Sequence, residues 1–203
     1  MKTGITVLCL LVVCFFVALD NYLINPPAGS GSKPSVTCQT VDDFQKYHDK
    51  QFLVINVVDG DTIDIDIPDG TKKFTRIRLW GVDTPETKNP KTGVMYFGPE
   101  ASEFTKDNSL NKQVRIFLNP EETRGYFGRL LAYVQLPDGK FLNEILISKG
   151  YAYADLRFKH DFFNKYTSLE AAARNNKLGL WENIDQNQLP QWLQKKKSNL
   201  IKH

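Results

Sequence analysis

The stretch 52–67 reads FLVINVVDGDTIDIDI and contains two β-type runs separated by a turn. The first run is rich in β-branched residues and ends at Asp59-Gly60, a pair that is typical of tight hairpin turns. The second run, 62–67, alternates isoleucine with threonine or aspartate, which is the pattern of a strand with one buried face. The stretch therefore predicts a β-hairpin at the start of the folded domain.

Outward from this hairpin, the chain continues with short β-type runs and helical segments. Further strands are predicted at 73–80, 114–118 and 129–136, and helices at 98–110, 142–150 and 161–178. Pro99 and Glu100 favour a helix start at Gly98, because proline suits the first turn and an acid suits the positive end of the helix dipole. Short strands joined mostly by hairpins, with the helices grouped late, predict an α+β fold: a five-stranded closed β-barrel with about three α-helices.

Composition excludes several classes of protein. The chain has 203 residues, of which 41% are hydrophobic, and a formal net charge of +3, so extended disorder, collagen and disulfide scaffolds are excluded. The length suits one domain of roughly 130–150 residues plus extensions. Residues 51–185, the predicted domain, carry 18 basic and 19 acidic side chains. A polyanion bound there must therefore be held by local charges or by a metal ion.

The first 24 residues form a separate hydrophobic segment. Residues 5–19 carry no charge, and the run continues to Ile24, which gives about 30 Å of helix, enough to cross a bilayer. No small-x-small cleavage site lies close behind the run. We expect residues 1–24 to form an uncleaved hydrophobic helix that anchors the protein in a membrane through 5–24. A cleaved signal peptide is the alternative, and both place the domain outside the cytoplasm.

Two further segments flank the predicted domain. Residues 25–50 are interpreted as a linker and N-terminal extension, because the part up to 36 is rich in Pro, Gly and Ser. Residues 186–203 are interpreted as a basic C-terminal tail, solvated rather than forming an amphipathic helix that touches polyanions. Cys38 is expected to be a free thiol, with an intermolecular partner as the alternative. Residues 51–185 contain no cysteine and so no internal disulfide.

Two aspartates are candidate metal ligands. Asp61 and Asp83 stand at predicted strand ends, and if the sheet brings them together a hard divalent cation would relieve their repulsion. Thr84 could add its backbone carbonyl, because the following proline holds it extended. Such a sparse oxygen site suits extracellular Ca²⁺ at millimolar concentration. For Asp64 and Asp66, a solvated strand face is the preferred interpretation over an extended metal cluster.

Three further charged residues suit phosphodiester chemistry. Arg78 and Arg129 offer planar guanidinium groups that match phosphate oxygens, and Glu86 could orient or deprotonate a water molecule. Each residue alone is more often a solvated surface group, and spacing alone does not separate Arg78 from its neighbour Arg76. A zinc site is not expected, because the three histidines show no ligand spacing. Together with a cation, the set predicts a phosphodiesterase.

In chain order, the motifs DGDT, RLWGVDTPE, YFGPEA and GRLLAY resemble the staphylococcal (thermonuclease-type) nuclease family, from about Phe52 to Glu182. The resemblance implies an OB-fold barrel and Ca²⁺-dependent hydrolysis of DNA and/or RNA that leaves 3′-phosphate ends. It further implies roles for single residues: Asp61, Asp83 and Thr84 (through its carbonyl) as Ca²⁺ ligands, Asp59 near the metal through water, Arg78 and Arg129 as phosphate-binding residues, and Glu86 as general base. We expect the enzyme to be a monomer.

The chain departs from the family pattern at the positions that bind the nucleotide. Tyr126 and Phe127 stand where the family has Lys-Tyr, and Leu156 and Phe158 stand where it has two base-stacking tyrosines. Substrate and base preference therefore stay open. The alternative function on the same fold is a non-catalytic nucleic-acid or protein binding module, and a structural membrane-surface protein is a third possibility.

Overall fold

The computed structural model describes residues 36–87, 93–197 and 200–201. The chain divides into two compact units, Met1–Gln39 and Thr40–His203, and the second contains all the elements discussed below except the start of α2. The expected hydrophobic helix within 1–24 lies outside the described residues. Among the residues that are described, no helix combines the length and the apolar content that a membrane span requires.

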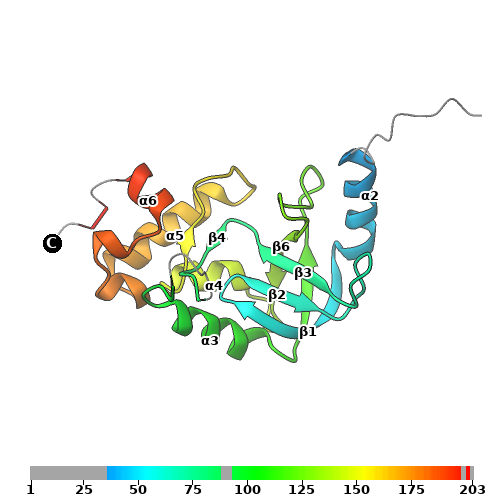
Figure 1. Ribbon diagram of the computed structural model, residues 1–203, viewed down its shortest axis with the longest axis horizontal. Helices are drawn as coiled ribbons and strands as arrows, with labels where there is room; N and C mark the ends of the chain where they lie inside the picture. The colour runs from blue at the N-terminus through cyan, green and yellow to red at the C-terminus, as the bar shows by residue number, and fades with distance from the viewer. Residues whose placement is uncertain (1–35, 88–92, 198–199, 202–203) are drawn as a thin grey trace, which may run out of the picture. The chain divides into compact units, whose positions relative to one another are not determined.

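Five strands close into a barrel (Figure 1). They are β1 (Lys50–Asp59), β2 (Thr62–Ile65), β3 (Thr75–Leu79), β5 (Gln113–Phe117) and β6 (Leu130–Gln135). Their order is β1-β2-β3-β6-β5, and β1 pairs with β5 to close the ring. All neighbours are antiparallel except β3 and β6, which are parallel. The predicted five-stranded barrel of OB-fold type is confirmed, and each predicted strand corresponds to an observed one.

The barrel interior is filled by the alternating apolar side chains that predicted the strands. Ile63 and Ile65 of β2 and Ile77 of β3 are fully buried. The opposite face of β2 is not solvated as expected, because Asp64 is only 2% exposed. It lies opposite Arg76 of β3, and the two side chains form an ion pair with 2.7 Å between Nε and Oδ1. Asp64 is thus neutralised by a cross-strand partner.

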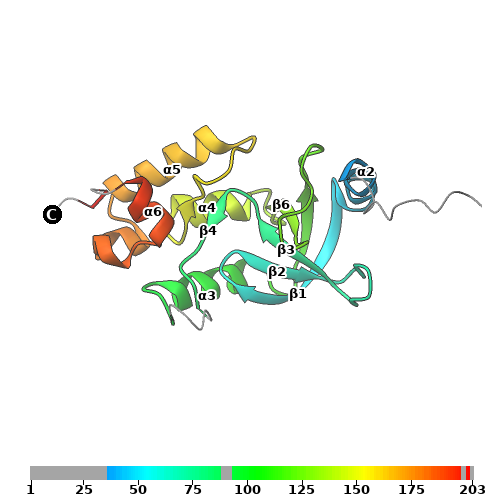
Figure 2. The ribbon, with the colours of Figure 1, turned by 45° about the horizontal axis from the view of Figure 1, so that its top comes forward.

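The three predicted helices are present as α3 (Gly98–Ser109), α4 (Leu142–Ser148) and α5 (Phe163–Asn175). α4 packs on β6 and on α5, and so connects the barrel to the helical part of the domain. The short strands β4 (Val82–Asp83) and β7 (Tyr153–Ala154) pair with each other in the same region. Figures 1 and 2 show α5 and α6 beside each other, on the side of the domain away from β1 and β2.

The C-terminal extension, defined here as residues 186–203, is folded where it is described. It contains the 3-10 helix η2 (Gln186–Gln188) and the helix α6 (Gln191–Lys196), and it follows the 3-10 helix η1 (Gly179–Glu182). Leu189 and Leu193 are buried in a cluster that includes Trp181. The expectation of a solvated tail is therefore wrong for these residues, because Leu189, which follows η2, and Leu193 of α6 are both buried in this cluster.

The helix α2 (Val36–Tyr47) occupies part of the segment interpreted as a linker and extension. Tyr47 at its end is fully buried in the barrel core, and its hydroxyl group lies 2.9 Å from the hydroxyl oxygen of Thr75. Cys38 falls within α2, but its side chain is not among those that the structure describes. The end of the N-terminal extension is thus part of the folded domain.

Candidate active site

The turn between β1 and β2 carries Asp59 and Asp61. Gly60 between them lies so close to Thr84 that a Cβ atom would come within 2.8 Å of that side chain, so only glycine fits. The hydroxyl group of Thr105 in α3 donates a 2.6 Å hydrogen bond to the carbonyl oxygen of Gly60. Both contacts fix the turn against its neighbours, which brings Asp61 next to Thr84.

The turn between β3 and β4 carries Asp83 and Thr84. Gly81 adopts a positive φ of 75°, and the ring of His160 occupies the space that a Cβ atom would need there. Asp83 then pairs through its backbone with Tyr153 of β7. Burial lowers the pKa of His160, which keeps the ring neutral so that its Nδ1 can accept the 3.3 Å hydrogen bond from the Phe162 backbone. The histidine is a packing residue here.

Asp61 is the most enclosed acid of the site, with 3% of its surface exposed. Its Oδ2 atom accepts two hydrogen bonds from Thr84, at 2.8 Å from the backbone nitrogen and at 3.0 Å from the hydroxyl group. Its Oδ1 atom accepts a 3.1 Å hydrogen bond from the hydroxyl group of Thr62. Asp59 contributes a weaker contact, because its Oδ1 lies 3.3 Å from the backbone nitrogen of Asp61.

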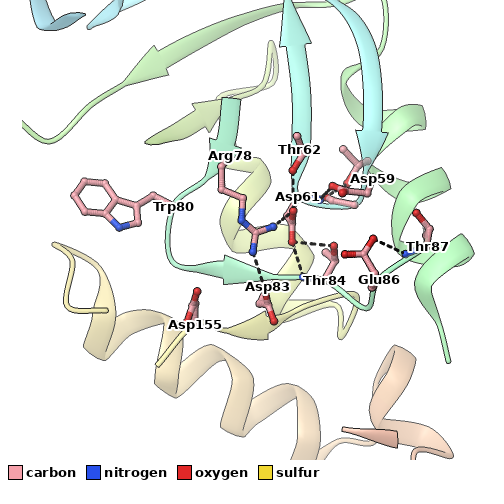
Figure 3. A network of polar contacts seen from close by, with 12 residues as sticks. Asp59, Asp61, Thr62, Arg78, Trp80, Asp83, Thr84, Glu86, Thr87 and Asp155 are labelled. Carbon is pink, nitrogen blue, oxygen red and sulfur yellow. Dashed lines mark hydrogen bonds and ion pairs between the residues drawn. The ribbon is translucent and has the colours of Figure 1, made fainter. Parts of the chain in front are cut away.

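Arg78 lies between the two aspartates, as Figure 3 shows. Its Nη1 atom contacts Oδ1 of Asp61, and its Nη2 atom lies 2.7 Å from Oδ1 of Asp83. The guanidinium group thereby separates two carboxylates that would otherwise repel each other. The spacing ambiguity with Arg76 is resolved by the structure, because Arg76 pairs with Asp64 instead.

Asp83 has two further partners that the sequence did not indicate. Arg157 places its Nη2 atom 2.9 Å from Oδ1 of Asp83 and 2.8 Å from Oδ2 of Asp155. Trp192 of α6 donates a 2.8 Å hydrogen bond from Nε1 to Oδ2 of Asp83. The tryptophan is 109 residues away along the chain, so no spacing rule could connect the two.

Arg129 and Glu86 line the same cavity as the two aspartates and Arg78, and its volume is about 690 Å³. Burial, followed by the repulsion of Arg78, lowers the pKa of Arg129 from its ordinary value. The charges of Asp59 and Glu86 act on Arg129 in the opposite direction. These mutual effects indicate that the two guanidinium groups and the acids share one small space.

The backbone around Glu86 is held by the start of α3. The Glu86 carbonyl oxygen accepts a 2.8 Å hydrogen bond from the backbone nitrogen of Met95. Gly98 lies so close to this carbonyl oxygen that a Cβ atom would come within 2.9 Å of it. The GPEA motif therefore does more than begin a helix, because its glycine permits α3 to pack against the backbone of Glu86.

The loop 122–128 forms another wall of the cavity and exposes two aromatic rings. Tyr126 is 96% exposed and Phe127 is 78% exposed. Arg124 anchors the loop through its Nη2 atom, 2.6 Å from Oδ1 of Asp43 in α2, and through its Nη1 atom, 2.5 Å from Oδ2 of Asp69. The rings thus project from a loop whose base is fixed.

Leu156 and Phe158, which follow β7, differ in how far their side chains are exposed. Leu156 is buried in the core, so it offers no surface for stacking. Phe158 is 60% exposed, lines the cavity and lies near the Arg157 guanidinium group, with 5.9 Å from Cζ to the ring centre. Among the other aromatic residues of this part of the chain, Tyr153 is fully buried and Tyr151, Phe162 and Phe163 pack against the core. Most of these rings therefore have structural roles.

The donor atoms of the site suit a hard cation. Asp61, Asp83 and the Thr84 carbonyl offer only oxygen ligands, which is the preference of Ca²⁺. A positive group already lies between the two carboxylates in the form of Arg78, which must move if a metal ion is to take its place. Within the described ranges, no three or more Asp, Glu, His or Cys side chains are grouped to hold a metal ion. The residues fit a sparse cation site completed by water.

Comparison with known proteins agrees with this geometry. Residues 76–183 match the family model of the staphylococcal nuclease homologues. Thermonuclease of Staphylococcus hyicus is 39% identical over 137 residues, which cover 67% of this chain and 78% of that protein. Thermonuclease of Staphylococcus intermedius is 42% identical, over 66% of this chain and 77% of the relative. Endonuclease YncB of Bacillus subtilis is 34% identical, over 61% and 58% respectively.

The matched residues 76–183 include Arg78, Asp83, Glu86 and Arg129, while Asp61 precedes them in the turn before β2, the strand that pairs with β3. The barrel, the cavity and these comparisons lead to one conclusion. The chain belongs to the family of staphylococcal nuclease homologues.

Proposed function

We propose that this protein is a Ca²⁺-dependent nuclease that hydrolyses phosphodiester bonds of DNA and/or RNA and leaves 3′-phosphate ends. One observation carries the proposal: Arg78 contacts both Asp61 and Asp83 in a cavity that Arg129 and Glu86 also line. The cavity combines two acids that suit a cation, two guanidinium groups that suit a phosphate, and Glu86 as a further acid. Phosphodiester hydrolysis can use such a set. The relatives named thermonuclease and endonuclease support the same activity.

The residues have separate roles in this mechanism. Asp61, Asp83 and the carbonyl of Thr84 would hold the cation, and Asp59 would support it through water. When bound, Ca²⁺ would supply positive charge for the phosphate oxygens and would relieve the repulsion between the two carboxylates. Arg78 and Arg129 donate hydrogen bonds to the phosphate oxygens of the substrate.

Glu86 acts as the general base. It accepts a proton from a water molecule whose oxygen attacks phosphorus in line with the leaving group. The bond between phosphorus and the 5′ oxygen breaks, and that oxygen takes up a proton from bulk water to become a 5′-hydroxyl group. Glu86 returns its proton to bulk water. Arg78 and Arg129 stabilise the charge that develops on the equatorial oxygens.

The substrate is held beside the reacting phosphate by Tyr126, Phe127 and Phe158, whose exposed rings offer faces for nucleobases. The enzyme acts as a monomer outside the cytoplasmic membrane, attached through residues 5–24 or released after their cleavage.

A cleavage assay tests the proposed function. The purified protein is incubated with DNA and with RNA, in Ca²⁺ and in a chelator, and the ends of the products are identified by enzymatic labelling. Cleavage that depends on Ca²⁺ and leaves 3′-phosphate ends is expected. Binding of either nucleic acid without any cleavage would instead support the alternative, a non-catalytic binding module.

A further inference from the structure

The C-terminal extension reaches the candidate cation site although it lies outside the residues that match the family model, which end at 183. The indole Nε1 of Trp192 donates to Oδ2 of Asp83 at 2.8 Å. An indole nitrogen only donates, so it orients a carboxylate without adding charge and without competing as a ligand. The contact therefore joins a segment outside the matched residues to a proposed metal ligand.

The two oxygens of Asp83 face different partners. Oδ1 faces Arg78, which also contacts Asp61, and it accepts the hydrogen bond from Arg157 as well (Figure 3 shows Arg78 between the two acids). Oδ2 faces Trp192. Rotation of the carboxylate would break the bond to the indole group, so Trp192 keeps Oδ1 directed towards the space shared with Asp61.

The indole group is itself held in place from several sides. Leu189 and Leu193 bury the extension against Trp181, and the Lys196 ammonium group donates to the Leu156 carbonyl oxygen. The guanidinium group of Arg157 lies 5.0 Å from the centre of the Trp192 ring, which is the geometry of a cation–π contact. The donor is thus part of a packed segment rather than a flexible side chain.

We propose that Trp192 is a positioning residue for the cation site: it orients Asp83 for Ca²⁺, and the C-terminal extension thereby completes the site. This inference rests on the proposed function, in which Asp61 and Asp83 hold the cation. Partners that orient metal ligands typically contribute 10–100-fold to metal affinity. The effect of Trp192 is therefore expected in Ca²⁺ affinity rather than in the rate at saturating Ca²⁺.

The test compares two tryptophan substitutions in the full-length chain. Trp192→Phe removes the donor and keeps an aromatic ring. Trp181→Phe is the matched control, because the Trp181 indole nitrogen is buried and meets no acceptor within the described part of the chain. Three quantities are measured: the Kd for Ca²⁺ by calorimetry, the Tm without Ca²⁺, and the Ca²⁺ concentration for half-maximal DNA cleavage.

Trp192→Phe is expected to raise the Kd and the half-maximal Ca²⁺ concentration about 10-fold, with an unchanged rate at saturating Ca²⁺. Trp181→Phe is expected to leave both Ca²⁺ values unchanged even if its Tm falls. A Kd within twofold of the parent value for Trp192→Phe, or an equal rise in Kd for both variants, would overturn the positioning role of Trp192. It would leave the proposed function intact. If the parent protein itself bound no Ca²⁺, the proposed cation site and this inference would both be wrong.

Discussion

Asp43 in α2 and Arg124 at the base of the loop 122–128 form a bidentate ion pair, with Nε 2.7 Å from Oδ2 and Nη2 2.6 Å from Oδ1. Both side chains are largely buried. Burial by itself would lower the pKa of Arg124, but the hydrogen bonds and charges of Asp43 and Asp69 outweigh it, so this pKa is raised above its ordinary value. The pair connects the N-terminal extension to the loop that carries Tyr126 and Phe127.

Asp43→Asn should therefore lower the free energy of unfolding by about 2–3 kcal/mol, the contribution of a hydrogen bond to a charged group, while Asp69 retains its contact with Arg124. Urea unfolding measures the loss. Asp42→Asn, one residue earlier on the exposed side of the same helix, is the control and should have little effect. Equal losses in the two variants would contradict the role of the ion pair.

Arg78→Ala should reduce the rate of DNA cleavage on the order of 10²–10³-fold, because a group that stabilises the transition-state charge is removed. The same variant removes the guanidinium group between Asp61 and Asp83, so the two carboxylates repel each other. Ca²⁺ should therefore raise the Tm of the variant more than it raises the Tm of the parent. Arg76→Ala is the control, since Arg76 pairs with Asp64 instead. It should lower stability and keep the cleavage rate within a few-fold; a similar rate for both variants would refute the assignment.

Removal of the metal is predicted to abolish cleavage, and addition of Ca²⁺ to the chelated protein should restore it. Asp61→Asn should eliminate the rise in Tm that Ca²⁺ causes, because the site loses one of its two carboxylates. Asp66→Asn changes an exposed acid directly after β2 and should keep the Ca²⁺ response. Thermal unfolding with and without Ca²⁺ checks both variants, and a preserved response in Asp61→Asn would exclude Asp61 as a ligand.

The double variant Tyr126→Ala/Phe127→Ala should raise the KM for single-stranded DNA at least fivefold and change kcat little. The reason is that stacking contributes about 1–3 kcal/mol per base and these two rings are the most exposed large apolar groups at the cavity. Val41→Ala removes an exposed apolar side chain of α2 and provides the control. An unchanged KM would show that the rings do not hold substrate.

The stability of the protein should depend on pH through Glu170. Burial raises the pKa of this acid above its ordinary value of 4.5, although its Oε2 accepts a 2.9 Å hydrogen bond from the Ala154 backbone. The folded state then binds the proton of Glu170 more strongly than the unfolded state does. The resulting contribution to the free energy of unfolding is fully present below pH 4.5 and is lost as pH rises through the pKa of the folded state.

Glu170→Gln removes that titration and can still accept the backbone hydrogen bond. The Tm of the variant minus the Tm of the parent should therefore increase between pH 4 and pH 8. Thermal unfolding across this range measures the difference, and Glu103→Gln, an exposed acid on α3, should give a constant difference. A difference for Glu170→Gln that falls with pH would mean that ionised Glu170 stabilises the folded state.

The sequence by itself determined the barrel and its strands. Alternating isoleucines at 63, 65 and 67 and the turn pair Asp59-Gly60 are local signals, because strand period and turn conformation depend on neighbouring residues. The same local signals located α3, α4 and α5 to within a few residues. The motifs also located six charged residues that line the shared cavity: Asp59, Asp61, Arg78, Asp83, Glu86 and Arg129. They did not indicate Arg157, which lines the same cavity.

Only the tertiary structure decided which of these charges meet. Arg76 and Arg78 share a strand face in the sequence, yet pairing with β2 directs one to Asp64 and the other to Asp61. Trp192 reaches Asp83 because buried leucines dock the C-terminal extension, and such contacts between distant residues leave no periodic trace along the chain. Local patterns report which face of an element is buried, whereas the partner across that face is selected by the packing of the whole domain.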